Sequence, residues 1–580
     1  MGLEIAAPDT PPVRRILLWL GASLLILAGV AAVCLAHNAE TLRAGLMYCS
    51  PRFLGAAFFL AVCGGMAAAR GYVREFRGLP PVFQYAALLL ALFAVLAAAL
   101  LPPATHRIFY DEQIYESIGL NIAYEGEAAM ADEAVIRYGD YTAHLAEYNK
   151  QPNAWPYLLS LVFRLFGAHD WLAFFTNNVL FGLAALAVFC LAWLLFASAW
   201  AALFAGLAFV CIPVNLQWAN TTAVEVSTAA FAVFTVLAVA MFTRRPNTRH
   251  LILATALAAC AVQFRPEAAL LLPVCGLLVL LRRPQTLAEP RFWACAALFL
   301  ALTAAHWCHL YAVRGEDWGS SGMKLGLAFV RENLAVNGLY YVRNREFPVL
   351  LTLAAAAGLF AWRRWRETAP LALWFLLLAG VFLFFYAGSY RYGADIRFSL
   401  VSYAPLAVLA GWGLHCAARL AARAGLPSAR GVALLLLAGS FVYFLPQVRA
   451  VGDEAWHARA DHRFAVQFAE MLPEHSMVYS HDPCIFLMQG KSASQMFMLG
   501  PDSDLDYLRQ RFPGGLYMHY GFWCVIDDAK QNPFCARILE HFECETVASF
   551  TEREYTFVLY RVRGRKTADA PGTDAAPAGR

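Results

Sequence analysis

The feature that most constrains this chain is a series of apolar runs, several of which reach the roughly 20 residues that a helix needs to cross a bilayer. One of them, "RRILLWLGASLLILAGVAAVCLAH", starts at Arg14. Hydrophobic residues make up 60% of the chain and charged residues 15%, whereas soluble domains are nearer half apolar and a quarter charged. The sequence therefore predicts a polytopic integral membrane protein.

Window hydropathy predicts about 13 spans. They lie near residues 15–36, 53–70, 82–101, 171–196, 199–213, 225–243, 249–264, 267–281, 291–312, 347–361, 369–387, 397–417 and 431–447. The first run has the arginines of a signal peptide, but its apolar part is too long and a second span follows. We predict that it is retained as the first helix.

Basic loops predict the orientation, because Lys and Arg concentrate in short cytoplasmic loops. With 13 spans, the basic segments "MAAARGYVREFRG", "FTRRPNTRHL", "LLRRPQ", "WRRWRET" and "CAARLAARAGLPSARG" all fall on one side. That side is predicted to be cytoplasmic, together with the N-terminus. A large loop at 102–170 and everything after about 448 then lie outside. The net charge of +4 gives no reason to expect a nucleic-acid partner.

The predicted fold class is an all-α polytopic membrane protein with a small C-terminal extracytoplasmic α/β domain. Strand-like runs ("SMVYSH", "GLYMHYGFWCVID", "YTFVLYRV") alternate there with helical ones ("FAVQFAEML", "CARILEHF"). We divide the chain into extra N-terminal spans (1–81), a transmembrane domain that includes the loop 102–170 (82–447), the α/β domain (448–565) and a disordered tail (566–580). The cysteines outside the apolar runs can form disulfides in an oxidising compartment, and the sequence predicts no particular pairing. They are Cys484, Cys524, Cys535 and Cys544.

Charged residues collect at one predicted membrane level, the outer one. Such residues are costly at the ends of spans and are candidates for function by default. The set consists of Asp111, Glu112, Lys150, Glu225, Arg265, Glu267, Arg391 and Arg397. Acids and cations at one depth suit a lipid-linked phosphate and a sugar transfer from it. A carboxylate would take the proton of an acceptor hydroxyl, and cations would stabilise the leaving phosphate. A divalent metal can replace part of that positive charge, and no metal ligands are assigned.

Each candidate also has a structural interpretation. Asp111 and Glu112 can cap the helix that starts near Gln113, and Lys150 can reach from an interfacial helix, "NAWPYLLSLVFRLFG", to water. Glu225 can be a helix-start carboxylate, and Arg391 a loop cation.

Further polar residues also have a structural interpretation. Arg265 and Glu267 can pair across a helix break. We predict that five further acids form the solvated face of the outer loop: Glu125, Glu127, Asp132, Glu133 and Asp140. His144 and His306 are isolated histidines, which are more often structural than metal-binding.

The order of these motifs resembles the GT-C superfamily of membrane glycosyltransferases. The most similar branch is that of the protein O-mannosyltransferases and the lipid A aminoarabinose transferase. The carrying segments are "YDEQIYESIGLNIAYEG", "YNKQPNAWPYLLSLVFRLFGAHD", "ANTTAVEVSTAAF", "QFRPEAALLLP" and "DIRFSLVSYAPLAVLAGWG". The chain departs from the pattern at Gln151, which precedes Pro152, at Glu225, where the family usually has Asp, and in two extra N-terminal spans.

The resemblance implies an inverting transferase that uses a polyprenyl-phosphate sugar donor and a lipid, glycan or protein acceptor, in a bacterial inner membrane. Asp111 would be the catalytic carboxylate, with Glu112 and Glu225 orienting the acceptor or the sugar. Lys150, Arg265 and Arg397 would hold the phosphate, and Glu267 and Arg391 belong to the same predicted binding group. The alternatives are a flippase or other transporter, since charged residues and broken helices also mark substrate paths, and a lipid-binding protein without catalysis.

Overall fold

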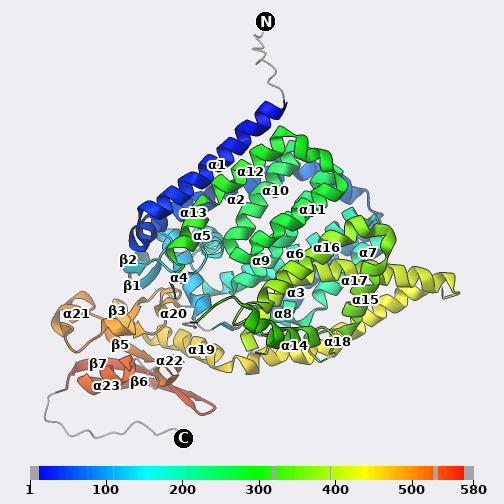
Figure 1. The fold of residues 1–580 in the computed structure, drawn as a ribbon. Helices are drawn as coiled ribbons and strands as arrows, with labels where there is room; N and C mark the ends of the chain where they lie inside the picture. The colour runs from blue at the N-terminus through cyan, green and yellow to red at the C-terminus, as the bar shows by residue number, and fades with distance from the viewer. Residues whose placement is uncertain are drawn as a thin grey trace.

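A computed structural model describes residues 12–108, 110–316, 322–343, 345–391, 393–426, 428–526 and 533–566. Figure 1 shows a large helical body, with helix α1 along one outer edge and a smaller unit of strands and short helices at one corner. The tail predicted at 566–580 lies, from residue 567 onward, outside the described residues.

The helices of the body follow the predicted apolar runs. They are α1 (Pro12–Ala36), α2 (Ala39–Arg77), α3 (Pro81–Leu100), α6 (Asp170–Phe196), α7 (Ala199–Val210), α8 (Pro213–Ala219), α9 (Val224–Arg244), α10 (Thr248–Phe264), α11 (Leu271–Arg282), α12 (Pro290–Leu302), α13 (Ala304–Ala312), α15 (Val349–Phe360), α16 (Trp365–Gly380), α17 (Leu400–Arg423) and α18 (Ala429–Glu454). Between them lie α4 (Asp111–Tyr124), α5 (Ala154–Phe166) and α14 (Val330–Tyr340).

The predicted class of membrane fold is confirmed. Among the described residues, eight helices are long and apolar enough to cross a bilayer, and two bent pairs, α7 with α8 and α12 with α13, raise the number to ten. The other predicted spans, 249–264, 267–281 and 347–361, are the shorter helices α10, α11 and α15. The count of about 13 stays a prediction.

Helices α6 and α9 form the centre of the body. In their most apolar stretches 72% and 83% of the residues are buried, against 0% in α1. Helix α17 packs closely against its neighbours because it carries glycines: a Cβ on Gly413 would lie 1.8 Å from the Ala354 carbonyl oxygen of α15. Small residues allow helix backbones to approach in this way. The packing fixes the start of α17, just after Arg397.

The smaller unit is built on one seven-stranded sheet in the order β2-β1-β4-β3-β5-β7-β6. Its strands are β1 (Met130–Arg137), β2 (Asp140–Glu147), β3 (Ser476–Ser480), β4 (Ser492–Gln495), β5 (Gly515–Tyr520), β6 (Phe542–Glu552) and β7 (Tyr555–Arg565). Strands β4, β3 and β5 are parallel, and the other pairs are antiparallel.

Short helices complete this smaller unit. They are α19 (Trp456–Met471), α20 (Pro483–Leu487), α21 (Leu505–Arg511), α22 (Phe522–Ile526) and α23 (Phe534–His541). The predicted small C-terminal α/β domain is thereby confirmed. Of its cysteines, Cys524 and Cys535 form a disulfide, whereas Cys484 and Cys544 are free.

The outer loop contributes the hairpin β1–β2 to this sheet. Glu133 and Ala134 of β1 pair with Ser494 and Ala493 of β4, so the sheet crosses the boundary drawn at residue 448. The hairpin corrects part of the prediction for the loop acids, which were expected to be solvated. Asp132 is buried, and Glu133 forms an ion pair with Arg511 at 3.1 Å. Both side chains contact protein because the hairpin packs into the smaller unit, where Arg511 of α21 reaches Glu133.

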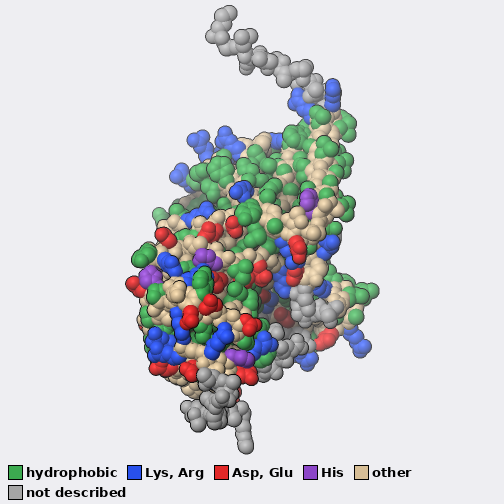
Figure 2. All heavy atoms as spheres, turned by 90° about the vertical axis from the view of Figure 1, so that its left-hand side faces the viewer, with side chains coloured by type: hydrophobic (Ala, Val, Ile, Leu, Met, Phe, Trp, Pro, Cys, Tyr) green, Lys and Arg blue, Asp and Glu red, His purple; other side chains and the backbone are tan. Residues whose placement is uncertain are grey.

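The surface separates into two regions. Figure 2 shows mostly apolar side chains over the upper part of the molecule, around α1, and mixed acidic and basic side chains over the lower part, which carries the sheet. Basic side chains with few acidic ones lie along the upper edge. This arrangement agrees with helices in a bilayer and a sheet in water.

The pairing of the hairpin with the C-terminal strands can be tested by a disulfide. Directly opposed residues of antiparallel strands have Cα atoms about 4.5–5.5 Å apart, within the range that a disulfide spans. We expect Ala134→Cys with Ala493→Cys to cross-link under oxidation. A protease site at Gly425 would cut the chain between the two cysteines, and the fragments should stay joined on a non-reducing gel. Ala134→Cys with Ser549→Cys, at the far edge of the sheet, should not link.

Candidate active site

The ends of three helices meet at one level of the body, near the sheet. Glu225 lies in the first turn of α9, Arg265 directly follows the last residue of α10, and Arg397 precedes α17. Helices α9 and α10 are sequence neighbours joined by a short basic loop, so the start of one and the end of the other lie side by side at the opposite end. The topology therefore brings together charges that are about 40 and 170 residues apart in sequence.

Glu225 is the centre of an ion-pair network. Its Oε1 accepts hydrogen bonds from Arg265 Nη1 and, at 2.9 Å, from Arg397 Nε. Arg265 also pairs with Glu267 across the helix break. The Glu225 side chain is only 3% exposed, and its Oε2 is buried without a hydrogen-bonding partner among the described residues.

The two arginines share one aromatic neighbour. The Arg265 Cζ lies 5.0 Å and the Arg397 Cζ 4.7 Å from the centre of the Phe398 ring. A ring face attracts cations that have left water, so Phe398 helps to hold two like charges close together. A pair of converging guanidinium groups suits an oxyanion such as phosphate.

Asp111 is the first residue of α4 and faces this network. Burial raises the pKa of Asp111 above its ordinary value. The charge of Arg397 lowers this pKa and that of Glu225 raises it, with smaller lowering effects from Lys150 and Arg265. Within the described part of the chain, no residue donates a hydrogen bond to the Asp111 carboxylate. The preceding residue, Tyr110, has a φ of 84°, a strained value of the kind that occurs at functional sites.

Glu112 has a different environment from its neighbour. It is fully buried, and its Oε1 accepts hydrogen bonds from the backbone N–H groups of Arg107 and Ile108, both at 2.8 Å. Its Oε2 accepts from the Thr222 N–H at 2.8 Å and from the Thr222 hydroxyl at 3.1 Å. Oε1 thus holds the linker before α4, and Oε2 joins the start of α4 to the segment before α9, so that both oxygens are already used by the fold.

Lys150 lies between β2 and α5, and its charge reaches Asp111. The adjacent Gln151, which departs from the family pattern, accepts a hydrogen bond from the Tyr115 hydroxyl at 3.0 Å. Tyr115 is buried and is influenced electrostatically by Asp111, Glu225 and both arginines. Tyr115 was not among the predicted site residues, although it stands four positions after Asp111 in the "DE..Y" segment.

The structure does not bring Arg391 into the network. Its side chain is exposed and forms no ion pair with any residue that the structure describes, because it belongs to the turn before the 3-10 helix η6 (Gly393–Ser399). The two isolated histidines lie elsewhere: His144 is exposed on β2, and His306 is buried in α13.

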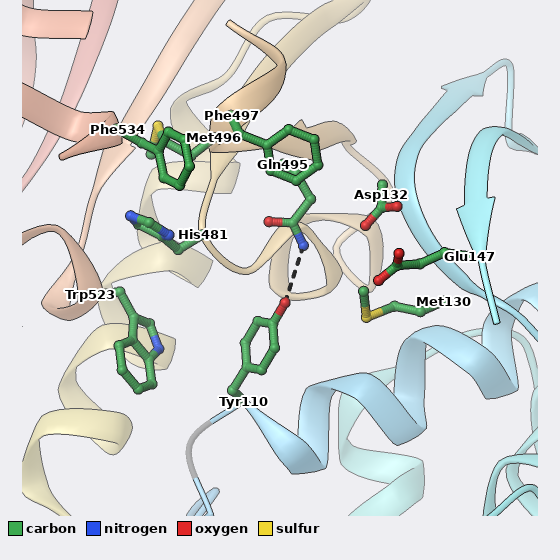
Figure 3. Close-up of a pocket in the computed structure, with 10 residues that line it drawn as sticks. All are labelled: Tyr110, Met130, Asp132, Glu147, His481, Gln495, Met496, Phe497, Trp523 and Phe534. Carbon is green, nitrogen blue, oxygen red and sulfur yellow. Dashed lines mark hydrogen bonds between the residues drawn. The ribbon is translucent and has the colours of Figure 1, made fainter. Parts of the chain in front are cut away.

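A cavity of about 350 Å³ lies beside Tyr110, between the hairpin and the C-terminal part of the sheet. Figure 3 shows the rings of Tyr110, Trp523 and Phe534 on one side and the carboxylates of Asp132 and Glu147 on the other. Burial and the nearby charge of Glu147 raise the pKa of Asp132 to about 7. The cavity therefore combines aromatic surface with hydrogen-bonding oxygens.

Comparison with solved structures shows which fold the chain has. The fold is similar to that of ArnT from Cupriavidus metallidurans bound to undecaprenyl phosphate, with a TM-score of 0.53 and 16% identity over 84% of this chain and 99% of that chain. The chain is an integral membrane protein with a GT-C-like fold. The oligosaccharyltransferase of Archaeoglobus fulgidus is also similar, with a lower TM-score of 0.49 and 12% identity over 80% of this chain and 73% of that chain.

Comparison of the sequence with family models identifies a matching segment. Residues 150–309 match the family described as dolichyl-phosphate-mannose-protein mannosyltransferase. The matching segment begins at Lys150 and contains Glu225, Arg265 and Glu267. The resemblance that the motifs indicate is thereby confirmed. A search of curated proteins finds no match to the chain.

The different environments of Asp111 and Glu112 predict different effects on stability. Glu112→Ala leaves buried N–H groups without an acceptor, which should cost about 3 kcal/mol and lower the unfolding temperature in detergent. Asp111→Asn removes no hydrogen bond and should change that temperature little. Equal effects of the two substitutions on thermal unfolding would contradict this division of roles.

Proposed function

We propose that the chain is a glycosyltransferase that moves a sugar from a polyprenyl-phosphate donor to a hydroxyl group of an acceptor outside the cytoplasm. The observation that carries the proposal is the position of Asp111. Its carboxylate accepts no hydrogen bond from the described residues, and it lies within electrostatic reach of Arg265 and Arg397, which converge on Glu225. A free base next to paired cations is what a transfer from a phosphate ester requires.

Asp111 is proposed to be the general base. Its carboxylate takes the proton of the acceptor hydroxyl while that oxygen attacks the anomeric carbon. The bond between this carbon and the phosphate oxygen breaks, and the lipid phosphate leaves with the bonding electrons. A single displacement of this kind inverts the configuration at the anomeric carbon.

The cations are proposed to hold the leaving phosphate. Arg265 and Arg397 are oriented by Glu225 before the substrate arrives, so their charge stabilises the transition state without reorganisation. Lys150 adds a third cation from the outer loop. The unpartnered Oε2 of Glu225 is available to a sugar hydroxyl, whereas Glu112 acts only by holding α4. Arg391 is no longer proposed to bind phosphate.

The acceptor is proposed to enter through the cavity beside Tyr110. Aromatic rings that stack on sugar rings, together with carboxylates that accept from hydroxyl groups, are typical of sites for polar, polyhydroxylated groups. This supports an acceptor or donor headgroup of that kind without naming one. The basic loops at the opposite end of the body support an extracytoplasmic site, with the N-terminus in the cytoplasm.

The first test is sugar transfer by the purified protein in liposomes. Radiolabelled polyprenyl-phosphate sugars would be the donors, and a cell-envelope extract would supply acceptors. Asp111→Asn should lower transfer at least about 1000-fold, because the general base and its alignment with the nucleophile are both lost, while donor binding by the same protein persists. The matched control is Asp140→Asn, an exposed acid in the hairpin turn of the same loop, which should transfer at the wild-type rate.

The outcomes separate the alternatives. Equal transfer by wild type and Asp111→Asn would contradict the assignment of the base. Label that crosses the bilayer without becoming covalently attached to an acceptor would support a flippase instead, for which the bent helices α7/α8 and α12/α13 are a structural basis.

The pH dependence of transfer gives a second prediction. Because the base must be ionised, the rate should rise with pH through the raised pKa of Asp111 and then level off. Arg397 lowers this pKa and Glu225 raises it. Arg397→Gln should therefore move the rising limb to higher pH, and Glu225→Gln should move it to lower pH. Shifts in the same direction for both substitutions, in a donor-saturated assay, would exclude Asp111 as the titrating group.

A further inference from the structure

A second polar cluster lies on the other side of α4 from the network around Glu225. It consists of His106, Glu116, Asp170 and His462, from four separate segments: the linker after α3, the second turn of α4, the first residue of α6, and α19. Glu116 follows Asp111 by five positions, which is about 140° around a helix. The two carboxylates of α4 therefore point to different sites.

The ligand-bearing atoms of the cluster are close together. His106 Nε2 lies 3.2 Å from Glu116 Oε1 and 3.8 Å from Asp170 Oδ1. His462 Nε2 lies 3.0 Å from Asp170 Oδ2. The side chains of His106 and Glu116 are 1% and 2% exposed. The cluster is thus a built, buried arrangement, with His462 closing its more open side.

Two buried carboxylates side by side need a proton or a cation between them. Each ion loses hydration on burial, and like charges repel, so the arrangement is costly unless positive charge lies between them. Burial raises the pKa of Glu116, and the charge of Asp170 raises it further. No Lys or Arg forms an ion pair with Glu116 or Asp170 in the described part of the chain. The repulsion is relieved by a proton that the two carboxyl groups share, by imidazolium protons or by a bound ion.

The distances favour an ion. Zinc binds His nitrogen and carboxylate oxygen at about 2.0–2.2 Å in a tetrahedron, whose edges are then about 3.3–3.6 Å long. The separations of His106 Nε2 from Glu116 Oε1 and Asp170 Oδ1, 3.2 and 3.8 Å, lie near that length, and one ligand atom from each of these three residues lies within 4.8 Å of the other two. His462 Nε2 lies 3.0 Å from the other Asp170 oxygen, Oδ2. Two imidazoles and two carboxylates are also a ligand set that suits zinc better than calcium or magnesium, which prefer oxygen alone.

We propose that His106, Glu116, Asp170 and His462 bind one zinc ion, which fastens the C-terminal part of the chain to α4. His106, Glu116 and Asp170 supply the three close ligand atoms, and in the proposed site His462 turns from Asp170 Oδ2 to the ion as the fourth ligand. Four protein ligands close the site, as in structural zinc sites, and leave no open position for chemistry. Helix α19 lies between the transmembrane body and the sheet (Figure 1), and His462 is its contribution to the site. Through Glu116 the ion would hold helix α4, which begins with Asp111. A role of the ion in positioning Asp111 for catalysis rests on the function proposed above.

Metal content of the purified full-length protein tests the site without any transfer assay. The protein would be purified without a metal-chelating resin and analysed by plasma mass spectrometry. We expect about one zinc per chain in the wild type. His462→Gln should weaken zinc binding at least about 100-fold, because loss of a ligand should exceed the 10–100-fold effect of losing an outer-shell partner. His169→Gln, next to Asp170 but exposed, should keep the ion.

A rescue variant guards against simple misfolding. His462→Cys restores a zinc-binding atom, so it should recover zinc and, after exchange, give the visible spectrum of tetrahedral, thiolate-bound Co²⁺. Zinc should raise the unfolding temperature of the wild type and of His462→Cys but not of His462→Gln. A wild type that takes up no zinc, or equal zinc in wild type and His462→Gln, would overturn the site and leave a hydrogen-bonded His–carboxylate cluster. None of these results depends on whether the chain transfers sugars.

Discussion

The structure of the candidate site depends on one buried carboxylate, that of Glu225. Removing a charge from water costs several kcal/mol unless an opposite charge accompanies it. Arg265 and Arg397 meet that requirement, and they come from a helix break and from a 3-10 segment before a helix. The requirement to pair one charge thus determines how the outer ends of α9, α10 and α17 lie relative to one another.

The adjacent acids Asp111 and Glu112 show how position decides the role of identical chemistry. Glu112 points into the protein, where four donors surround its oxygens, and it holds α4 against Thr222. Asp111 is influenced electrostatically by Arg397 and Arg265, and no residue that the structure describes donates a hydrogen bond to its carboxylate. The first carboxylate therefore gives rigidity, and the second keeps an oxygen available to a proton. By fixing the start of α4, Glu112 also fixes the position of the Asp111 side chain.

The shared sheet links the membrane part to the C-terminal part. Strand β1 pairs with β2 on one side and with β4 on the other, so residues of the outer loop become an interior strand of a sheet that is otherwise C-terminal. The cavity beside Tyr110 exists only because the two parts meet there. The cluster of His106, Glu116, Asp170 and His462 is a second junction between the same parts, on the opposite face of α4.

The sequence by itself determined the membrane class, the positions of the long helices and most of the charged set, because apolar runs and isolated charges within them are strong local signals. It also indicated β3, β5, β7, α19 and α23, whose patterns are regular. It did not reveal β1 and β2, because "MADEAVIR" and "DYTAHLAE" carry charges and alanines in place of an alternating apolar pattern. Strand β1 pairs with β4, more than 300 positions away, and β2 pairs with β1.

Only the tertiary structure decided which charges work together. Glu112 and Asp111 are equivalent in a sequence, and so are Arg391 and Arg397, but burial and partners differ at each position. Glu116 and His462 did not stand out at all, since neither has a neighbour in sequence that marks it. Local sequence records where the chain can be helical or buried, whereas the energy of a charge depends on what other segments bring within a few ångströms of it.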